Sequence, residues 1–414
     1  MADGLQVEII TIGNEVITGH IVDTNAAFLA DTIFSLGAKI TRIVSVGDEV
    51  GIIAEALREA MTRSDLILVS GGLGPTPDDR TPEAAAQALG RELTLHQEYL
   101  DTLKEKFRTW KLTFTRSDEK QARLPHGAEP LPNPIGLCGF KVEEGAKTIF
   151  FFPGVPREMK GIVAEALLPF LRGKIHGKEE IVRSTVFKVF GISEARAKEL
   201  IEGITENVEL AYLPSFPEIR VRVIVRGIDE EEVAALHTQC EKEFSERLGT
   251  YLYGKGDEVL ESVVGRLLRA RKATLAVAES CTGGLIAHRI TEIPGSSDYF
   301  LRGVVAYSNK AKEELLGVQT EILEKYGPVS TEVVEQMARG VRESSGATVG
   351  VATTGIAGPT GGTPEIPVGR VYIALCAEDI SEVKHHDFFG DRHAIKLMAS
   401  AVALDRVRRY LLGI

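Results

Sequence analysis

The chain of 414 residues is longer than one hydrophobic core usually allows, so we expect two or three domains. Apolar residues make up 44% and charged residues 26%, which is typical of a soluble globular protein. The net charge of −11 argues against non-specific binding to nucleic acid or to an anionic membrane, and no apolar run approaches the ~18 residues of a membrane span. The first residues do not resemble a signal peptide and the four cysteines lack metal-ligand spacing, so we expect a cytoplasmic protein without disulfides.

Residues 1–171 alternate short apolar runs with amphipathic segments, which is typical of βα units on a parallel sheet. The predicted strands are Leu5–Ile12, Lys39–Val46, Asp65–Val69 and Thr148–Phe152. The predicted helices are Asn25–Leu36, Val50–Thr62 and Arg157–Leu171. This pattern predicts a doubly wound α/β domain.

Residues 172–256 follow a different order, in which strands outnumber helices. The predicted strands are Ile181–Phe190, Val208–Leu213, Glu218–Val225 and a short Thr250–Tyr253, and the helices are Glu194–Ile204 and Glu230–Leu248. A βαββα order with a short last strand predicts a small ferredoxin-like α+β module.

Residues 257–414 return to the α/β alternation and form a second, independent doubly wound α/β domain. The predicted strands are Thr274–Ala278, Gly303–Ser308, Ala347–Thr353 and Gly369–Cys376. The predicted helices are Val259–Arg271, Leu285–Glu292, Thr331–Ser344 and Ala394–Leu412. The fold class is therefore α/β, with two such domains joined by the α+β module.

Ser280 lies where the strand Thr274–Ala278 gives way to a helix, with Gly283 and Gly284 just after it. A serine at this position has an exposed hydroxyl, and free N–H groups at the helix start would stabilise an oxyanion. The same pattern also fits Ser280 or Thr282 as a plain helix cap, which is a common use of such side chains.

Lys310 follows the strand Gly303–Ser308, so it lies at the same edge of the predicted sheet as Ser280. A partly desolvated lysine is the base in serine–lysine hydrolases, and none of the four histidines of this domain has a motif that suggests a triad. Taken alone, Lys310 fits a solvated lysine at the start of a helix better than a catalytic base.

A third loop, Thr353–Gly362, follows the buried strand Ala347–Thr353 and contains four glycines. Such a loop offers N–H donors without side-chain obstruction, which suits a phosphate or a carboxylate. It also fits a long flexible connection. The coincidence of a serine, a lysine and a glycine loop at three strand ends is more informative than any one of them.

These segments resemble the signature segments of the CinA C-terminal family, which includes nicotinamide mononucleotide deamidases of the PncC type. The similar segments are Ala278–Gly284, Tyr307–Lys310 and Thr354–Pro359. The resemblance implies that Ser280 attacks the carboxamide, that Lys310 is the general base, and that Tyr307 and Thr354 assist. It also implies a substrate site without a metal, formed by Thr282, Gly283, Gly284, Gly355, Ala357, Gly358 and a phosphate-binding Arg392.

The segment Ser70–Glu83 follows the buried strand Asp65–Val69 and is rich in glycine and acidic residues. Its glycines, Gly71, Gly72 and Gly74, would expose amides to an anion. Asp78 and Asp79 are hard oxygen ligands that suit Mg²⁺ held together with phosphates, although acidic residues here also complement a helix dipole. Asp23, before the first helix, fits either an N-cap or a second polar arm of this site.

The front domain resembles the molybdopterin-binding domain of the MoaB and MogA type, and the whole chain resembles the full-length CinA family. The similar segments are Gly13–Glu15, Ile21–Asn25, Gly71–Glu83 and Phe152–Met159. The resemblance implies an ADP-ribose pyrophosphatase that depends on a divalent metal (Mg or Co) and potassium. It implies a nucleotide site at Asp23, Asn25, Gly71, Gly72, Gly74 and Thr76, with Asp79 and Asp78 as metal ligands.

Three functions remain open at this stage. The leading hypothesis is a two-activity enzyme of pyridine nucleotide recycling that acts on nicotinamide mononucleotide and ADP-ribose, and that forms a homodimer without nucleic-acid or membrane partners. In a second hypothesis, the N-terminal domain is the main catalyst and the C-terminal domain is a degenerate nucleotide sensor. The third is a non-catalytic molybdopterin carrier or competence-related partner protein.

Overall fold

The structure is a computed structural model that describes residues 5–131, 133, 136, 139–174, 181–204 and 208–414. The chain divides into two compact units, one of residues 1–183 with 226–234 and the other of residues 184–225 with 235–414. Cys240, Cys281 and Cys376 are buried, and none of them forms a disulfide within the described part of the chain. No helix of the described residues is long and apolar enough to cross a membrane.

The N-terminal domain is built on a six-stranded sheet in the order β2-β1-β3-β8-β7-β6. Its strands are β1 (Gln6–Ile12), β2 (Lys39–Val46), β3 (Leu66–Ser70), β6 (Glu129–Leu131), β7 (Gly139–Glu144) and β8 (Lys147–Phe152), and β4 (Leu93–Leu95) pairs separately with β5 (Arg123–Pro125). Strands β2, β1, β3 and β8 are parallel, whereas β7 and β6 are antiparallel. The central strands β1 and β3 are buried almost throughout because helices cover both faces.

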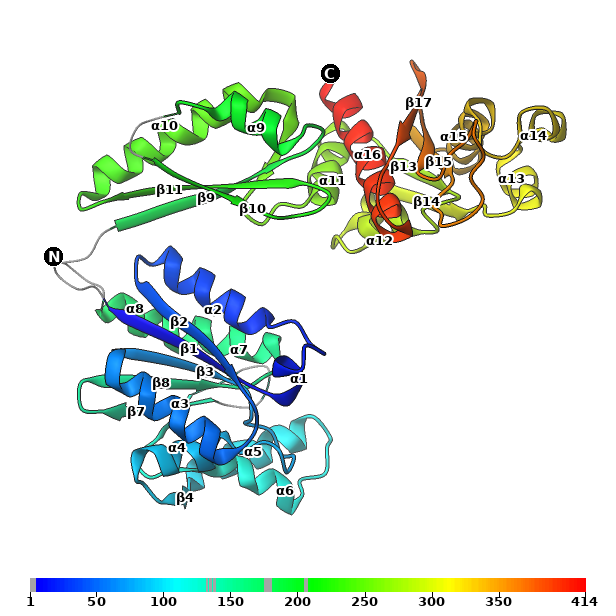
Figure 1. Ribbon diagram of the computed structural model, residues 1–414. Coiled ribbons are helices and arrows are strands. Elements are labelled where there is room, and N and C mark those ends of the chain that lie inside the picture. Colours follow the sequence, from blue (N-terminus) through cyan, green and yellow to red (C-terminus); the bar gives the residue numbers. More distant parts are fainter. Residues whose placement is uncertain (1–4, 132, 134–135, 137–138, 175–180, 205–207) are drawn as a thin grey trace. The chain divides into compact units, whose positions relative to one another are not determined.

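The helices of this domain divide between the two faces of the sheet (Figure 1). One face carries α2 (Thr24–Ser35), α7 (Pro156–Ile162), the π-helical turn Val163–Leu167 and α8 (Leu168–Lys174). The other carries α3 (Val50–Arg63), α4 (Thr81–Leu89) and α5 (Gln97–Thr109). The short helices α1 (Asn14–Ile17), α6 (Arg116–Glu119) and η1 (Lys120–Ala122) complete it.

The middle module has the order β9-α9-β10-β11-α10-β12 and an antiparallel sheet in the order β10-β11-β9-β12. Its elements are β9 (Ile181–Val189), α9 (Glu194–Ile201), β10 (Val208–Leu213), β11 (Ile219–Gly227), α10 (Glu230–Leu248), η3 (Gly249–Tyr251) and β12 (Leu252–Lys255). The sheet order is the one a ferredoxin-like βαββαβ unit produces, so the α+β prediction is confirmed.

The C-terminal domain has a five-stranded sheet in the order β14-β13-β15-β16-β17. Its strands are β13 (Leu275–Glu279), β14 (Phe300–Val305), β15 (Val349–Gly355), β16 (Arg370–Cys376) and β17 (Ser381–Asp387). β14, β13 and β15 are parallel, and β16 and β17 are antiparallel additions. The prediction of an α/β fold is confirmed, with antiparallel strands at one edge of each large sheet.

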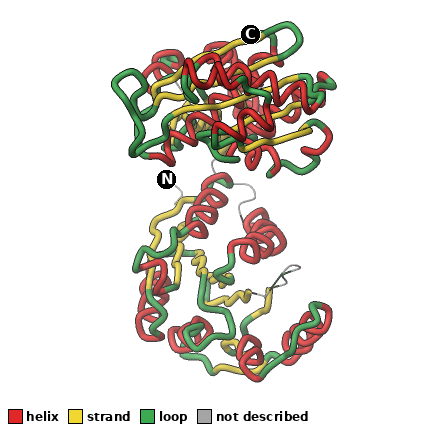
Figure 2. The backbone as a smooth tube through the Cα atoms, turned by 90° about the vertical axis from the view of Figure 1, so that its right-hand side faces the viewer, coloured by secondary structure: helices red, strands yellow, loops and turns green. Residues whose placement is uncertain are grey.

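Helices also cover both faces of the C-terminal sheet, and Figure 2 shows its strands running between them. One face carries α11 (Leu260–Arg271), α12 (Leu285–Thr291) and α16 (Arg392–Leu412), and the other carries α13 (Asn309–Leu316), α14 (Thr320–Tyr326) and α15 (Thr331–Ser345). A short η4 turn (Ser296–Asp298) precedes β14. Ser330 caps α15 by accepting a hydrogen bond from the Val333 N–H.

Candidate functional site

The loops after β13, β14 and β15 meet at the carboxyl edge of the C-terminal sheet, because these three strands are parallel neighbours. They enclose a cavity of about 250 Å³. Its lining includes Ser280, Cys281, Tyr307, Ser308, Lys312, Thr354, Gly355, Ala357, Gly358 and Arg392. The three loops that the sequence analysis identified therefore lie together around one cavity.

Backbone hydrogen bonds hold Ser280 in place, and the residue lines the cavity. Its N–H donates to the Thr353 carbonyl at 3.0 Å, and its own carbonyl accepts from the Gly283 N–H at 3.1 Å. Helix α12 begins later, and its N-cap is Gly284 without any side-chain capping bond. Ser280 is thus no helix cap, and Thr282 is buried in a hydrogen bond to the Thr353 hydroxyl instead.

The first amides of α12 do not face the cavity, contrary to our expectation. The carboxylate of Glu279, which is only 1% exposed, accepts hydrogen bonds from the N–H groups of Ile286 and Ala287 at 3.1 and 2.9 Å. Glu279 therefore fixes the nucleophile loop to α12 and occupies the donors that we had expected to form an oxyanion hole. The N–H groups of Ala357 and Gly358 make no bond within the described protein and remain available.

Lys310 does not contact Ser280, and its assignment as the base is wrong. Its side chain is 79% exposed and pairs with Glu314 at 3.5 Å. Lys312 takes the expected place: it is 2% exposed, and its Nζ lies 3.4 Å from the Ser280 Oγ. Burial lowers the pKa of the Lys312 ammonium below the ordinary 10.5, and none of the described carboxylates pairs with it.

The error arose from the end of β14, which we placed at Ser308 although the strand ends at Val305. Ser308 is the N-cap of α13 and accepts a hydrogen bond from the Ala311 N–H at 3.1 Å. Of the two lysines in the first turn, Lys312 is buried with Leu316, four residues on, so both lie on the inner side of the helix. A helical reading of residues 309–316 would have found Lys312 beside this buried stripe.

Tyr307, Arg392 and Thr354 close the cavity from three sides. Arg392 donates to the Tyr307 hydroxyl at 2.9 Å and to the Gly358 carbonyl at 2.8 Å, so it connects the second and third loops. Thr354 is buried and donates to the Pro328 carbonyl at 2.8 Å. Tyr307 is 61% exposed and forms an outer wall. All three line the cavity where the sequence had placed them.

The two glycines of the nucleophile loop shape the backbone rather than the cavity wall. Gly283 and Gly284 have φ values of +60° and +90°, in the left-handed region that favours glycine. A Cβ on Gly283 would lie 3.5 Å from the Nζ of Lys396, a residue of α16 that the sequence analysis missed. Lys396, His393 and Arg392 share a second, open depression at the start of α16.

The N-terminal domain has its own cavity of about 300 Å³, at the carboxyl ends of β1 and β3. Of the predicted residues, Asp23, Asn25 and Gly71 line it. Asn25 donates from Nδ2 to the Ser70 hydroxyl and the Gly154 carbonyl, whereas its buried Oδ1 has no hydrogen-bond partner among the described residues. Asp23 is the N-cap of α2 and accepts from the Ala26 N–H at 2.8 Å, so it acts as a cap while lining the cavity.

The predicted residues Gly72, Gly74, Thr76, Asp78 and Asp79 are not part of this cavity lining. The loop instead folds onto itself, because one oxygen of Asp79 accepts from both the N–H and the hydroxyl of Thr76. A Cβ at Gly72 would meet the Thr81 hydroxyl and one at Gly74 would meet Asp79, so both glycines serve close packing.

The acidic residues of the same loop lie within electrostatic reach of Asp48. Burial raises the pKa of Asp48, and the nearby charges of Glu15, Asp78 and Asp79 raise it further. No group of three His, Cys, Asp or Glu side chains in the described residues could hold a metal ion. The carboxylates therefore gather negative charge without forming an all-protein cage, which fits a cation only if a bound phosphate completes its ligands.

Comparison with known proteins gives the family. The chain matches the models of the CinA C-terminal domain over residues 257–411, of a probable molybdopterin binding domain over 8–173, and of the damage-inducible protein CinA KH domain over 184–254. A CinA-like protein of Geotalea uraniireducens is 42% identical over 414 residues, 99% of this chain and 98% of that protein. The chain belongs to the CinA family.

A second full-length relative agrees with this CinA-family assignment. A CinA-like protein of Citrifermentans bemidjiense is 44% identical over 412 residues, covering 99% of this chain and 98% of the relative. A solved structure of the protein CinA of Thermoplasma acidophilum, described as of unknown function, is 35% identical and covers 42% of this chain and 99% of its own, with a TM-score of 0.38. The assignment rests on the full-length relatives.

Proposed function

We propose that the C-terminal domain is a serine amidase that hydrolyses nicotinamide mononucleotide to nicotinic acid mononucleotide and ammonia. The observation that carries the proposal is the buried contact between the Lys312 Nζ and the Ser280 Oγ at 3.4 Å. A lysine buried without a carboxylate partner gives up its proton more readily than an exposed lysine, and the neutral amine can then take the proton of a serine hydroxyl. The neighbouring thiol cannot take this role, because burial raises the pKa of Cys281 to about 12.

The reaction needs only groups that line the cavity. Ser280 Oγ attacks the carboxamide carbon while neutral Lys312 takes the hydroxyl proton. Lys312 then passes that proton to the leaving nitrogen, so that ammonia departs and an ester remains on Ser280. Water cleaves the ester with Lys312 again as base. The pyridinium charge of the substrate already activates the carbonyl, and the N–H groups of Ala357 and Gly358 are candidate donors to the oxyanion.

The charges beside the cavity suit a phosphate ester. Arg392 faces the cavity beside Tyr307, and His393 and Lys396 lie next to it on the first turns of α16. A guanidinium can bind a phosphate through two parallel hydrogen bonds to its oxygens. The ammonium of Lys396 adds a positive charge near Gly283. The choice of nicotinamide mononucleotide over another phosphorylated amide rests on the family resemblance.

The proposal is tested by measuring ammonia and nicotinic acid mononucleotide formed from nicotinamide mononucleotide by the whole chain. We expect equal amounts of both products, and a loss of about 10³-fold or more in kcat/KM in Ser280→Ala. Ser297→Ala, at an exposed serine, is the matched control and keeps full activity. Activity in Ser280→Ala equal to that of the control would exclude Ser280 as the nucleophile.

We propose as a second activity the hydrolysis of the pyrophosphate bond of ADP-ribose by the N-terminal domain. Two observations favour it: the unpartnered Oδ1 of Asn25 in the cavity and the carboxylates around Asp48. A divalent cation held by Asp79, Asp78 and substrate phosphates would neutralise charge on the pyrophosphate. The residues of the chain would bind the nucleoside at Asn25 and Gly71.

Asp79→Asn tests this activity, with Asp31→Asn, on the outer side of α2, as the matched control. We expect the rate of ADP-ribose hydrolysis to fall by about 10²-fold in Asp79→Asn and to stay unchanged in Asp31→Asn. A molybdopterin carrier would instead release a fluorescent pterin on denaturation and show no hydrolysis in any variant. That result would overturn the second activity and leave the amidase proposal intact.

A further inference from the structure

A large cavity lies at the opposite edge of the C-terminal sheet from Ser280. Its volume is about 820 Å³, within the range of small-molecule sites. It is formed where β13 and β15 begin and where α11, α15 and α16 end. The catalytic loops follow the carboxyl ends of the same strands, so this second cavity is separate from the proposed amidase site.

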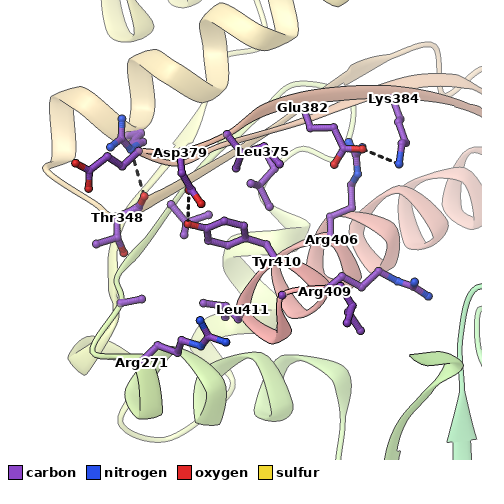
Figure 3. A pocket seen from close by; sticks show the side chains of 17 residues that line it. Arg271, Thr348, Leu375, Asp379, Glu382, Lys384, Arg406, Arg409, Tyr410 and Leu411 are labelled. Carbon is purple, nitrogen blue, oxygen red and sulfur yellow. Dashed lines mark hydrogen bonds and ion pairs between the residues drawn. The ribbon is translucent and has the colours of Figure 1, made fainter. Parts of the chain in front are cut away.

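The floor of this cavity is apolar and contains one aromatic ring. Val349, Leu375 and Leu411 contribute aliphatic side chains, and Tyr410 adds its ring beside them (Figure 3). The Tyr410 hydroxyl donates to Asp379 at 2.9 Å, which fixes the ring against the floor. A floor of this composition suits a flat, largely apolar group such as a base.

Two arginines at the rim keep donors free for an anion. Arg271 extends from the end of α11 toward Leu411 and Tyr410 (Figure 3), and it makes no hydrogen bond or ion pair to the described residues. Arg342 uses only its Nε, in a bond to the Thr348 carbonyl at 3.2 Å. Both guanidinium charges oppose the rise that burial causes in the pKa of Tyr410, so both lie within electrostatic reach of one hydroxyl.

The other charged groups of the lining are largely engaged with each other. Glu382 pairs with Lys384 at 2.6 Å and lies 3.2 Å from Arg406, which is 9% exposed. Arg409 donates to Asp405 on its own helix. Arg271 and Arg342 lie near helix C-termini, so their charges also complement the helix dipoles. That role does not explain why a cavity with an apolar floor lies beside them.

We propose that this cavity binds a nucleoside monophosphate, with the phosphate on Arg271 and Arg342 and the base over Leu375 and Tyr410. Asp379 and Glu378 at the rim accept hydrogen bonds from sugar hydroxyls or an amino group of the base. A nucleoside monophosphate is large enough to occupy much of the cavity, whereas an inorganic anion is too small to do so. This site is independent of the amidase reaction and would place a second nucleotide on the far side of the same sheet.

Arginine footprinting tests the site in the whole chain. Phenylglyoxal modification is followed by mass spectrometry of the peptides, with adenosine monophosphate, inorganic phosphate or neither present. We expect adenosine monophosphate to slow modification of Arg271 about fivefold or more and inorganic phosphate to slow it much less. Arg339, an exposed residue of α15 outside the cavity, should react equally in all three conditions. Protection of Arg392 alone, equal reaction of Arg271 in all conditions, or equal protection by phosphate would each overturn the proposal.

A binding measurement gives a second readout. Calorimetric titration with adenosine monophosphate should show a site whose affinity falls about tenfold in Arg271→Gln and is unchanged in Arg339→Gln. Because Arg271 has no partner among the described residues, its replacement removes no contact that holds the fold. An identical titration of the two variants would show that Arg271 only complements the end of α11.

Discussion

At the scale of single residues, the burial of Lys312 is the feature from which the chemistry of the site follows. Lys310 and Lys312 belong to the same helical turn, yet only Lys312 is enclosed, beside Ser280. The difference comes from the direction in which a helix points each side chain and not from the chemistry of lysine. Composition cannot choose between them, whereas the helical spacing of residues 309–316 places Lys312 beside the buried Leu316.

The pH dependence of the amidase should follow Lys312. Only the neutral amine accepts a proton, so kcat/KM should rise with pH as Lys312 loses its proton. Because burial lowers the pKa of Lys312, this rise should be centred below the ordinary 10.5. A pH profile of the wild type against Lys310→Ala checks it. A rise centred at 10.5, or its absence, would speak against Lys312 as the base.

The same burial makes Lys312 costly for stability. Its folded-state pKa lies below the unfolded value, so the unfolded chain binds more protons and stability rises with pH between the two values. Lys312→Met should therefore raise the melting temperature at neutral pH, and the gain should shrink toward pH 10.5, although activity is lost. Thermal unfolding at both pH values measures this, with Lys310→Met as control. A lower melting temperature in Lys312→Met would contradict it.

At the scale of elements, Glu279 explains why the nucleophile loop keeps its shape. Its carboxylate connects the end of β13 to the first turn of α12, across a loop in which two glycines adopt positive φ. The strand–serine–glycine–helix pattern was visible in the sequence. The use of the helix amides by Glu279 was not, because it pairs a side chain with backbone groups seven and eight residues further along the chain.

Glu279→Ala should destabilise the C-terminal domain by about 2 kcal/mol or more, because it leaves two N–H groups of α12 without an acceptor. Chemical denaturation followed by circular dichroism gives the value. Glu292→Ala, at an exposed glutamate just after the same helix, should change it by less than about 0.5 kcal/mol. Equal effects of the two substitutions would remove the positioning role of Glu279.

At the scale of the whole molecule, the alternation of strands and helices predicted the two α/β domains and the α+β module well. Lys39–Val46, Val208–Leu213 and Glu230–Leu248 match the structure residue for residue. Between α4 and β8, the three-residue strands β4, β5 and β6 went unpredicted because such short strands carry little periodicity, and the longer α5 and β7 were also missed. Strand β17 was missed because its exposed residues alternate weakly.

The site was predicted to the level of loops, and less well to the level of side chains. Ser280, Tyr307, Thr354 and Arg392 line the cavity as expected, whereas Lys310 does not. In the front domain, the loop after β3 was identified, but its hydrogen bonds turn Thr76 and Asp79 toward each other. Hydrogen bonds between polar groups within one loop cannot be predicted from the hydrophobic periodicity of the sequence.

The two proposed activities should respond in opposite ways to a chelator. The proposed amidase mechanism relies on Ser280 and Lys312 and on no metal ion, so nicotinamide mononucleotide hydrolysis should be unchanged by excess ethylenediaminetetraacetate. Hydrolysis of ADP-ribose should be lost and should return with added Mg²⁺ or Co²⁺. Parallel assays on one preparation check both. If chelation abolishes both reactions, the serine–lysine mechanism for the C-terminal domain is excluded.

The most direct measurement of the central claim compares Lys312→Ala with Lys310→Ala in ammonia release from nicotinamide mononucleotide. The two variants lose the same side-chain atoms from the same helical turn, and of the two lysines only Lys312 lies beside Ser280. We predict that kcat falls by about 10³-fold in Lys312→Ala and changes less than about twofold in Lys310→Ala, with both proteins folded. Full activity in Lys312→Ala, or its loss in Lys310→Ala, would contradict the account.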